Sequence, residues 1–165
     1  MINNSAVFLR WLKYEDNFGS VLNVTADIEL IQGQYYPTVA FSGVISDING
    51  AYAGVVGHPD SSALNIMKKM EALSFNVLGD GNKYRVMIQT KESRLDGEYN
   101  HYGITFDTEK NQASVITVNI NDFTQQEGWG KQVLLNKKNA EVLQFAPYTP
   151  GEFDIKIWNI MFHRQ

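Results

Sequence analysis

The fold is decided by the run Leu73-Ser-Phe-Asn-Val-Leu-Gly-Asp-Gly-Asn-Lys-Tyr-Arg-Val-Met-Ile-Gln-Thr90. Two alternating segments flank Gly79-Asp80-Gly81 in this run. Glycine supplies the positive backbone angles of a tight reversal and aspartate tolerates them, so the pattern predicts a β-hairpin. The residues expected to face the core are Leu73, Phe75 and Val77 in the first strand and Tyr84, Val86 and Ile88 in the second.

The opposite face of the second strand carries Arg85, Met87 and Gln89, because successive side chains of a strand point to opposite sides. A sheet that buries one face and lines the other with long polar and sulfur-containing side chains fits a binding floor. An ordinary solvated sheet face is the alternative for Arg85 and Gln89. The sequence leaves both interpretations open.

The composition predicts one globular domain over residues 1–165. Hydrophobic residues make up 44% of the chain and aromatic residues 12%, which suits a sizeable core in an all-β domain. The net charge of −4 argues against a nucleic-acid partner, which would favour a basic patch. The sequence contains no cysteine, so disulfides and thiolate metal sites are excluded.

We expect no membrane span, because no apolar run approaches the roughly 20 residues that a spanning helix needs. Residues 6–12 are apolar but too short, and Arg10 interrupts them. They also lack a small-residue cleavage site, so they do not read as a signal peptide. Any secretion signal of a parent protein is expected to lie outside this chain.

The rest of the chain also alternates like a series of short strands. Residues 7–11 indicate an edge strand, residues 14–19 a turn, and residues 60–70 a helix capped by Asp60 or Ser61. Further strands are expected at residues 21–31, 35–44, 52–56, 99–106, 113–120, 140–146 and 153–162. The series predicts an all-β fold, a jelly-roll β-sandwich with one short helix.

The order of several short motifs along the chain carries a family resemblance. The motifs are Leu73-Ser-Phe-Asn-Val77, Gly79-Asp-Gly81, Tyr84-Arg-Val-Met-Ile88, Tyr102, Phe106, Val118-Asn-Ile-Asn-Asp-Phe123, Trp129-Gly130, Leu143-Gln-Phe145 and Phe153-Asp-Ile-Lys-Ile-Trp-Asn-Ile160. Over roughly residues 38–162 this order resembles the galactose-binding-like jelly rolls. That group joins the family 11 carbohydrate-binding modules to the Complex I intermediate-associated protein 30 family.

The resemblance implies a concave sheet that binds a single β-glucan chain through tyrosines and hydrogen-bonding side chains. By position, Asp96 of Asp96-Gly-Glu98 matches a ligand-binding aspartate, and Tyr52 matches a cleft tyrosine. The loop after Phe123 carries binding groups in these modules but departs here from their Arg, Asp and Tyr set, which leaves the glycan open. The corresponding residues of this chain are Gln126, Glu127 and Trp129.

A structural calcium ion is the one cofactor that the resemblance leaves open. In the last strand, Trp158-Asn159 stands where these modules usually carry an Asp-Asn or Asp-Asp pair. No metal ligand is therefore identified at that place.

Sugar chemistry selects a consistent set of side chains from the sequence. Sugar rings stack C–H patches on aromatic faces, and their hydroxyls need donors and acceptors. Tyr99, His101 and Gly103 are expected on one face of the strand beside that of Arg85, with Gly103 letting a sugar ring approach the backbone. The side chains that supply the mix are Arg85, Gln89, Tyr99, His101 and Gln144.

Structural roles compete with the binding roles at several of these positions. Tyr52 and Tyr99 also fit core or edge packing, and Trp129 fits a buried staple between two glycines. His101 fits an ordinary surface histidine, and Tyr148 fits a turn residue that covers the end of the sandwich.

The sequence predicts no enzyme. Glycoside hydrolysis needs two carboxylates about 5–9.5 Å apart. The candidates Glu92, Asp96, Glu98 and Glu127 all fall on expected polar loops, where solvated charges are the ordinary interpretation. No Gly-x-Ser-x-Gly elbow and no His-Glu-x-x-His pair occur.

Two function hypotheses follow from these observations. The first is an extracellular, non-catalytic carbohydrate-binding module that holds a β-glucan and is appended to a glycoside hydrolase, without nucleic-acid or membrane partners. The second is a protein-interaction or assembly domain of the Complex I intermediate-associated type, or a structural surface sandwich. The second would need an exposed apolar patch and no polar groove.

Overall fold

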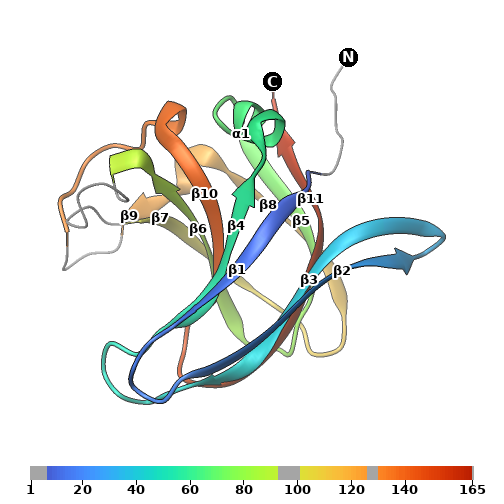
Figure 1. Cartoon of the computed structure of the whole chain (residues 1–165), viewed down its shortest axis with the longest axis vertical. Helices are drawn as coiled ribbons and strands as arrows, with labels where there is room; N and C mark the ends of the chain where they lie inside the picture. Colours follow the sequence, from blue (N-terminus) through green and yellow to red (C-terminus); the bar gives the residue numbers. More distant parts are fainter. Residues whose placement is uncertain (1–6, 93–100, 126–129, 165) are drawn as a thin grey trace.

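The computed structural model describes residues 7–92, 101–125 and 130–164, which form two antiparallel sheets packed face to face (Figure 1). Within this part of the chain, one sheet has six strands in the order β1 (Leu9–Glu15), β4 (Ala53–Pro59), β10 (Ala140–Pro147), β6 (Lys83–Thr90), β7 (Tyr102–Asp107) and β9 (Thr124–Gln125). The other has five, ordered β2 (Val21–Ile31), β3 (Gln34–Ile45), β11 (Gly151–His163), β5 (Ala72–Leu78) and β8 (Ala113–Asn119). The expected jelly-roll β-sandwich is confirmed.

The expected hairpin around Gly79-Asp80-Gly81 is wrong. β5 pairs with β11 and β8, whereas β6 pairs with β10 and β7 in the other sheet, so this segment crosses between the sheets. The Asp80 carboxylate holds the crossing. It accepts hydrogen bonds from the Tyr84 hydroxyl (3.0 Å) and the backbone N–H of Asp154 (2.8 Å), which ties the turn to β11.

Most expected strands lie within a few residues of the observed ones, and β2 has the expected bounds. Tyr14 is an exception: it belongs to β1, and the turn begins only at Asp16. The expected strand at residues 99–106 is described from residue 101 on, and β7 begins at Tyr102.

Helix α1 (Ser61–Met67) is capped as expected, because the Asp60 side chain accepts the N–H of Ala63 at 2.8 Å. It ends before Met70, which is buried in the core as the chain turns into β5. Two short 3-10 helices, η1 (Ile120–Asp122) and η2 (Lys137–Asn139), add to it. No helix among the described residues has the length and apolar character to span a membrane.

The core lies between the sheets and consists of the residues that the alternation places there. Both predicted inward sets on β5 and β6 are buried. Phe75 packs its ring edge-on against Phe106 and Phe145, with centroids 5.1 Å apart in each pair. The inward face of β6 packs in this core. Its outward face, which carries Arg85 and Met87, therefore lies on the outer side of the sandwich.

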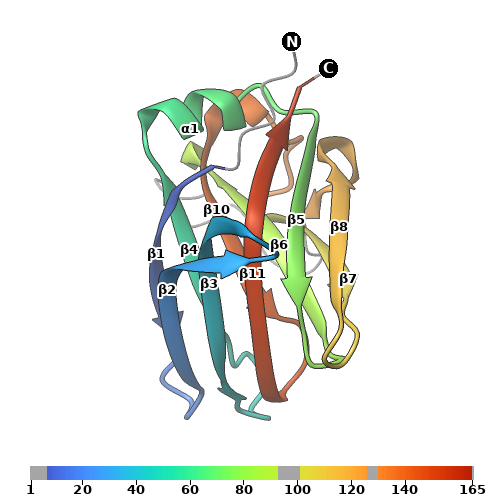
Figure 2. The same ribbon diagram turned by 90° about the vertical axis from the view of Figure 1, so that its right-hand side faces the viewer.

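β2 and β3 belong to the five-stranded sheet, and the far end of their two-stranded ribbon bends away from it and crosses in front of β11 (Figure 2). Glu29 of the ribbon forms an ion pair with Lys156 of β11, with Oε2 and Nζ 3.1 Å apart. Ile28 and Leu30 flank Glu29 in the strand and point to the opposite side of the ribbon, where they are exposed together with Tyr35.

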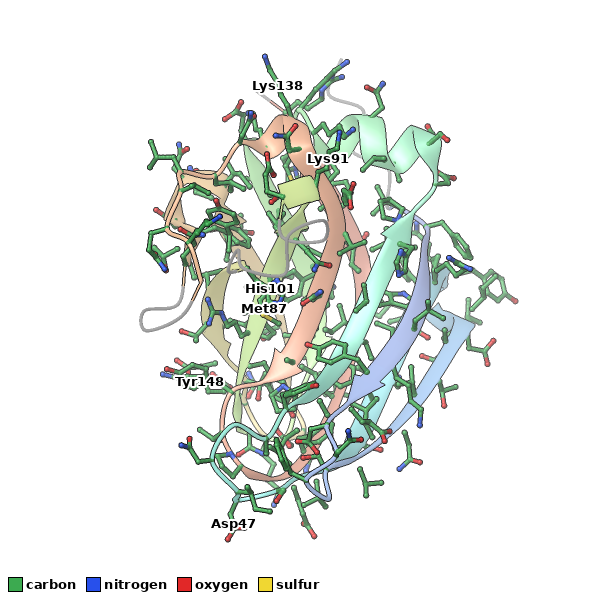
Figure 3. The ribbon with its side chains drawn as sticks, turned by 60° about the vertical axis from the view of Figure 1, so that its left-hand side comes forward. Asp47, Met87, Lys91, His101, Lys138 and Tyr148 are labelled. Atoms are coloured by element: carbon green, nitrogen blue, oxygen red, sulfur yellow. The ribbon has the colours of Figure 1, made fainter. Side chains whose placement is uncertain are left out.

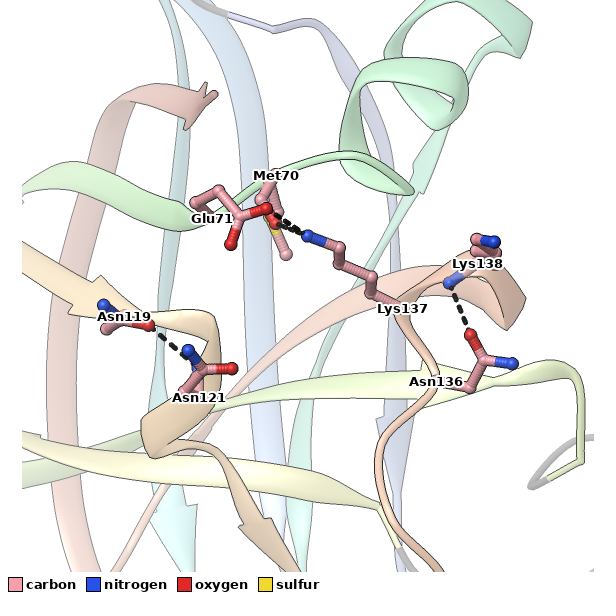
Figure 4. A network of polar contacts seen from close by, with 7 residues as sticks. All are labelled: Met70, Glu71, Asn119, Asn121, Asn136, Lys137 and Lys138. Carbon is pink, nitrogen blue, oxygen red and sulfur yellow. Dashed lines mark hydrogen bonds and ion pairs between the residues drawn. The ribbon is translucent and has the colours of Figure 1, made fainter. Parts of the chain in front are cut away.

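A polar network closes the end of the sandwich near η2 (Figure 4). Lys137 donates to the carbonyl of Met70 at 3.1 Å and forms an ion pair with the Glu71 carboxylate. Glu71 in turn accepts the N–H of Ile120 through its backbone carbonyl at 2.9 Å. The network therefore joins the chain before β10 to the starts of β5 and η1.

Candidate functional site

A groove of about 820 Å³ lies on the outer face of the six-stranded sheet. The register places Leu12, Val56, Gln144, Met87 and Gly103 side by side across β1, β4, β10, β6 and β7. Figure 3 faces this surface, with Met87 and His101 near its middle and Tyr148 at its rim. The lining residues with aromatic or hydrogen-bonding side chains are Tyr14, Tyr52, Arg85, Gln89, His101, Gln144 and Tyr148.

Two glycines let long side chains lie flat along the floor. A Cβ added at Gly54 would lie 2.4 Å from the Tyr14 hydroxyl oxygen, and one added at Gly103 would lie 2.2 Å from Arg85 Nε. Tyr14 and Arg85 therefore cover these two positions. The expectation that Gly103 leaves its backbone open to a sugar ring is wrong, because the Arg85 guanidinium occupies that space and donates to the Thr124 carbonyl at 3.3 Å.

Tyrosines form the wall at one end of the groove. Tyr52, on the loop before β4, and Tyr148, on the loop after β10, are 53% and 55% exposed, so both offer ring surface to a ligand. The ring of Tyr14 lies 6.0 Å from that of Tyr52 at an interplanar angle of 36°. Burial, followed by the nearby Tyr52, raises the pKa of Tyr14, which stays a neutral donor and acceptor.

Asp16 holds Tyr52 in place. Its carboxylate accepts hydrogen bonds from the N–H of Tyr52 (2.6 Å) and Phe18 (2.9 Å) and from the Ser20 hydroxyl (2.7 Å). Its own N–H donates to the Tyr52 carbonyl at 3.0 Å. Burial acts to raise the pKa of Asp16, but these hydrogen bonds together lower it below its usual value. The ionised carboxylate thus fixes the tyrosine loop to the end of β1.

The middle of the floor carries amide and imidazole groups. Gln144 is only 6% exposed, and its amide Nε2 donates to Gln89 Oε1 at 3.4 Å. Burial and then the charge of Arg85 lower the pKa of His101, so this imidazole is neutral at neutral pH. Burial also lowers the pKa of Arg85, yet a guanidinium keeps its charge at neutral pH. The floor therefore offers neutral donors and acceptors beside one cation.

Five of the residues predicted from the sequence line this groove together: Tyr52, Arg85, Gln89, His101 and Gln144. Asp96, Tyr99, Glu127 and Trp129, with the neighbouring Gln126, lie outside the described residues. The sequence pattern does not identify Tyr14 as a groove residue, because residues 14–19 resemble a turn. For Tyr148 it favours a turn residue that covers the end of the sandwich. The signal for Tyr14 is its alternation with Leu12, which puts both residues on one face of a strand. The only signal for Tyr148 is its place directly after the strand that carries Gln144.

The described residues show no carboxylate cluster of the kind that holds a calcium ion. No group of three or more His, Asp or Glu side chains gathers in the described part of the chain in a way that could hold a metal. At the place considered from the sequence, Trp158 is buried, and the Asn159 amide donates to Asn76 Oδ1 at 3.3 Å. We therefore assign no metal to the groove or to β11.

The chain is similar to a known family and to known structures. A model of the Complex I intermediate-associated protein 30 (CIA30) family matches residues 20–157. No curated protein matches the sequence significantly. The family 11 carbohydrate-binding module of a cellulosomal cellulase of Clostridium thermocellum superimposes with a TM-score of 0.72 at 18% identity, covering 100% of this chain and 95% of that one.

Two further solved structures are similar. A family 11 module from Clostridium thermocellum in complex with a β-1,3-1,4-mixed-linked tetrasaccharide has a TM-score of 0.62 at 17% identity, covering 97% of both chains. An exo-β-agarase has a TM-score of 0.56 at 12% identity, over 98% of this chain but 25% of the agarase. At these identities the likeness shows a shared fold.

Proposed function

The chain belongs to the Complex I intermediate-associated protein 30 family, and we propose that it is a non-catalytic carbohydrate-binding module that holds a β-glucan chain. The observation that carries the proposal is the groove, an open hollow of about 820 Å³ with exposed tyrosines and hydrogen-bonding side chains on one sheet face. Concave sites with a few convergent polar groups are where ligands ordinarily bind.

The groove suits the two sides of a sugar ring. Tyr52 and Tyr148 offer flat apolar faces against which the C–H patches of a pyranose can stack. Gln89, His101 and Arg85 offer donors and acceptors for the hydroxyls. A neutral polysaccharide such as a β-glucan needs this combination, in which the Arg85 guanidinium serves as a hydrogen-bond donor.

The comparisons support the same ligand class. A structure with this fold is a family 11 module that holds a mixed-linked tetrasaccharide, and another belongs to a cellulosomal cellulase. By analogy we extend the proposal to a covalently linked glycoside hydrolase and an extracellular location for the parent protein. The ligand-binding roles of Asp96, Tyr99, Glu127 and Trp129 remain part of the proposal.

We assign no catalysis to the groove. Glycoside hydrolysis would need two carboxylates facing the sugar. The described lining of the groove contains amides, tyrosines, one histidine and one arginine, and no carboxylate. Glu92, considered from the sequence, is used as an acceptor by the Asn139 amide away from this lining.

Affinity gel electrophoresis with soluble β-glucans tests the proposal. We expect the wild-type protein to be retarded, with a dissociation constant of roughly 0.01–1 mM, because few atoms are desolvated and hydroxyls compete with water. Tyr52→Ala should lose retardation while keeping its fold. Tyr35→Ala, which removes an exposed tyrosine from the β2–β3 ribbon, is the matched control and should migrate like the wild type. Wild-type protein that no polysaccharide retards would defeat the idea.

A protein-interaction role is the second candidate, and one observation favours it. Phe8, Ile28, Leu30 and Tyr35 expose apolar surface along the β2–β3 ribbon and the start of β1. That role does not account for the polar groove on the other sheet. Wild-type protein that binds no glucan would favour this role over carbohydrate binding. Loss of glucan binding in Tyr52→Ala and in a second groove substitution, Gln89→Ala, would count against it.

A further inference from the structure

A second hollow of about 340 Å³ adjoins the groove at the end of the sandwich. It lies between the loop before β4 and the loop after β10 and extends toward Asp47 at the lower end of the molecule (Figure 3). We propose that this hollow, the loop pocket, is an additional subsite that takes the continuation of the polysaccharide chain held in the groove. The inference rests on the proposed function.

The loop pocket and the groove are one continuous surface. They share six lining residues, which are Gly50, Ala51, Tyr52, Ala146, Pro147 and Tyr148. Tyr52 and Tyr148 stand on the border from opposite loops. A chain that stacks on these two rings and continues past them therefore enters the loop pocket.

The wall of the loop pocket is held in place before any ligand arrives. The Ser20 hydroxyl accepts the N–H of Ser46 at 3.0 Å, and the Ser46 hydroxyl accepts the N–H of Ile48 at 3.3 Å. The Ala51 N–H donates to the Ile48 carbonyl at 3.0 Å, and Asp16 fixes Tyr52 beyond it. On the opposite loop, the Tyr148 N–H donates to the Lys83 carbonyl at 3.0 Å. A preformed wall lowers the entropy cost of binding.

The lining matches a sugar rather than a purely apolar or charged ligand. Ile48 is 51% exposed and, with Pro147 and Pro150, gives apolar surface for C–H patches. Asp47, Asn49 and Thr149 are exposed on the same two loops and offer acceptors and donors for hydroxyls. The pocket thus repeats, on loops, the chemistry that the groove has on strands.

Isothermal titration with β-glucan oligosaccharides of four and eight residues tests the subsite. We expect Ile48→Ala to weaken binding of the octasaccharide about 2- to 5-fold and to leave the tetrasaccharide unchanged, since a short chain is satisfied by the groove. Ile28→Ala, at an exposed isoleucine on the ribbon, is the matched control and should change neither. A longer oligosaccharide can bind in more registers, which raises its affinity statistically. This gain cancels when each variant is compared with the wild type on the same ligand.

A filling variant provides the second test. Thr149→Met places a longer, uncharged side chain in the loop pocket and should reduce the affinity for the octasaccharide toward that for the tetrasaccharide. Thermal unfolding establishes that each variant is folded. Wild-type octasaccharide affinity in both variants, or an equal loss for both ligands, overturns the subsite but not the proposed function. Failure of the wild type to bind either oligosaccharide defeats the proposed function itself.

Discussion

Gly103 and Arg85 show how a single position shapes the groove. A methyl group at position 103 would meet the guanidinium end of Arg85, which is flexible and can move aside. We therefore expect Gly103→Ala to change the free energy of unfolding by less than ~1 kcal/mol. The displaced guanidinium should weaken β-glucan binding about 3- to 10-fold, the worth of one weakened hydrogen bond. Titration and chemical denaturation measure the two effects.

Gly54→Ala is the contrasting variant. Its added Cβ would lie 2.4 Å from the Tyr14 hydroxyl and 2.6 Å from the Phe145 carbonyl oxygen, and the second of these belongs to the backbone of β10. We expect this variant to lose about 1–3 kcal/mol of stability from overpacking. Equal stability losses at positions 54 and 103 would contradict the view that Arg85 gives way and the backbone does not.

Asp16 makes the stability of the groove wall depend on pH. Hydrogen bonds lower its pKa in the folded protein, so its stabilising contribution is complete above the ordinary aspartate pKa of about 3.9. That contribution is lost as the pH falls through the lower pKa of the folded state. The melting temperature of Asp16→Asn should therefore lie below that of the wild type at pH 7, and the gap should narrow toward pH 3.

Asp27→Asn serves as the control, because the Asp27 carboxylate accepts only the local N–H of Ile28 among the hydrogen bonds described. Its melting temperature should follow that of the wild type at both pH values. A gap between Asp16→Asn and the wild type that stays constant or widens on acidification would contradict the role given to the ionised carboxylate.

Residue types and alternation were enough to predict part of the groove. Arg85, Gln89 and Gln144 could be placed on outward faces because their neighbours in sequence are apolar at period two. Tyr14 could not be placed, because Glu15-Asp-Asn-Phe-Gly19 resembles a turn that begins one residue earlier. Asp16 looked like a turn residue, and its link to Tyr52 joins positions 36 residues apart.

At the scale of elements, Tyr84 links the crossing between β5 and β6 to β11. Its hydroxyl donates to Asp80 at 3.0 Å and accepts the N–H of Asp154 at 3.2 Å, while its ring is fully buried. Tyr84→Phe keeps the ring but removes both bonds of the hydroxyl, while the Asp154 N–H keeps its shorter bond of 2.8 Å to the Asp80 carboxylate. We expect a loss of about 1–3 kcal/mol in the free energy of unfolding, measured by urea denaturation.

Tyr36→Phe is the matched control, because its hydroxyl donates to Gln34 Oε1 at 3.1 Å on an exposed ribbon. We expect it to cost less than ~0.5 kcal/mol. If both substitutions cost the same, the Tyr84 hydroxyl does not hold the crossing.

The same elements show what local sequence cannot decide. The faces of β5 and β6 followed from alternation, since each strand buries one side whatever its partner. Whether the two strands pair was not encoded in Gly79-Asp80-Gly81. A glycine-rich reversal fits a hairpin and a crossing equally well. In the folded chain Asp80 accepts a hydrogen bond from Asp154, which lies 74 residues away in the sequence, and no local pattern reveals that contact.

At the scale of the whole molecule, the groove is a product of the jelly-roll strand order. Residues of β1, β4, β10, β6 and β7 meet on one face because the chain moves repeatedly between the two sheets. The two tyrosine-bearing loops reach the same end because β4 and β10 are antiparallel neighbours. Tyr52 and Tyr148 thus line one groove although 96 positions separate them in the sequence.

This arrangement predicts that Tyr148 binds the ligand and is not merely a cover for the end of the sandwich. Its ring is exposed, its N–H is held by the Lys83 carbonyl, and Lys83 Nζ lies 6.0 Å from its ring centroid. Tyr148→Ala should weaken β-glucan binding about 3- to 10-fold, as expected for one lost stacking contact, and leave the melting temperature nearly unchanged. If Tyr148 only covers the end of the sandwich, Tyr148→Ala should lower the melting temperature and leave the affinity for β-glucan unchanged. Because the backbone bond to Lys83 survives the substitution, any loss of affinity reports on the ring itself.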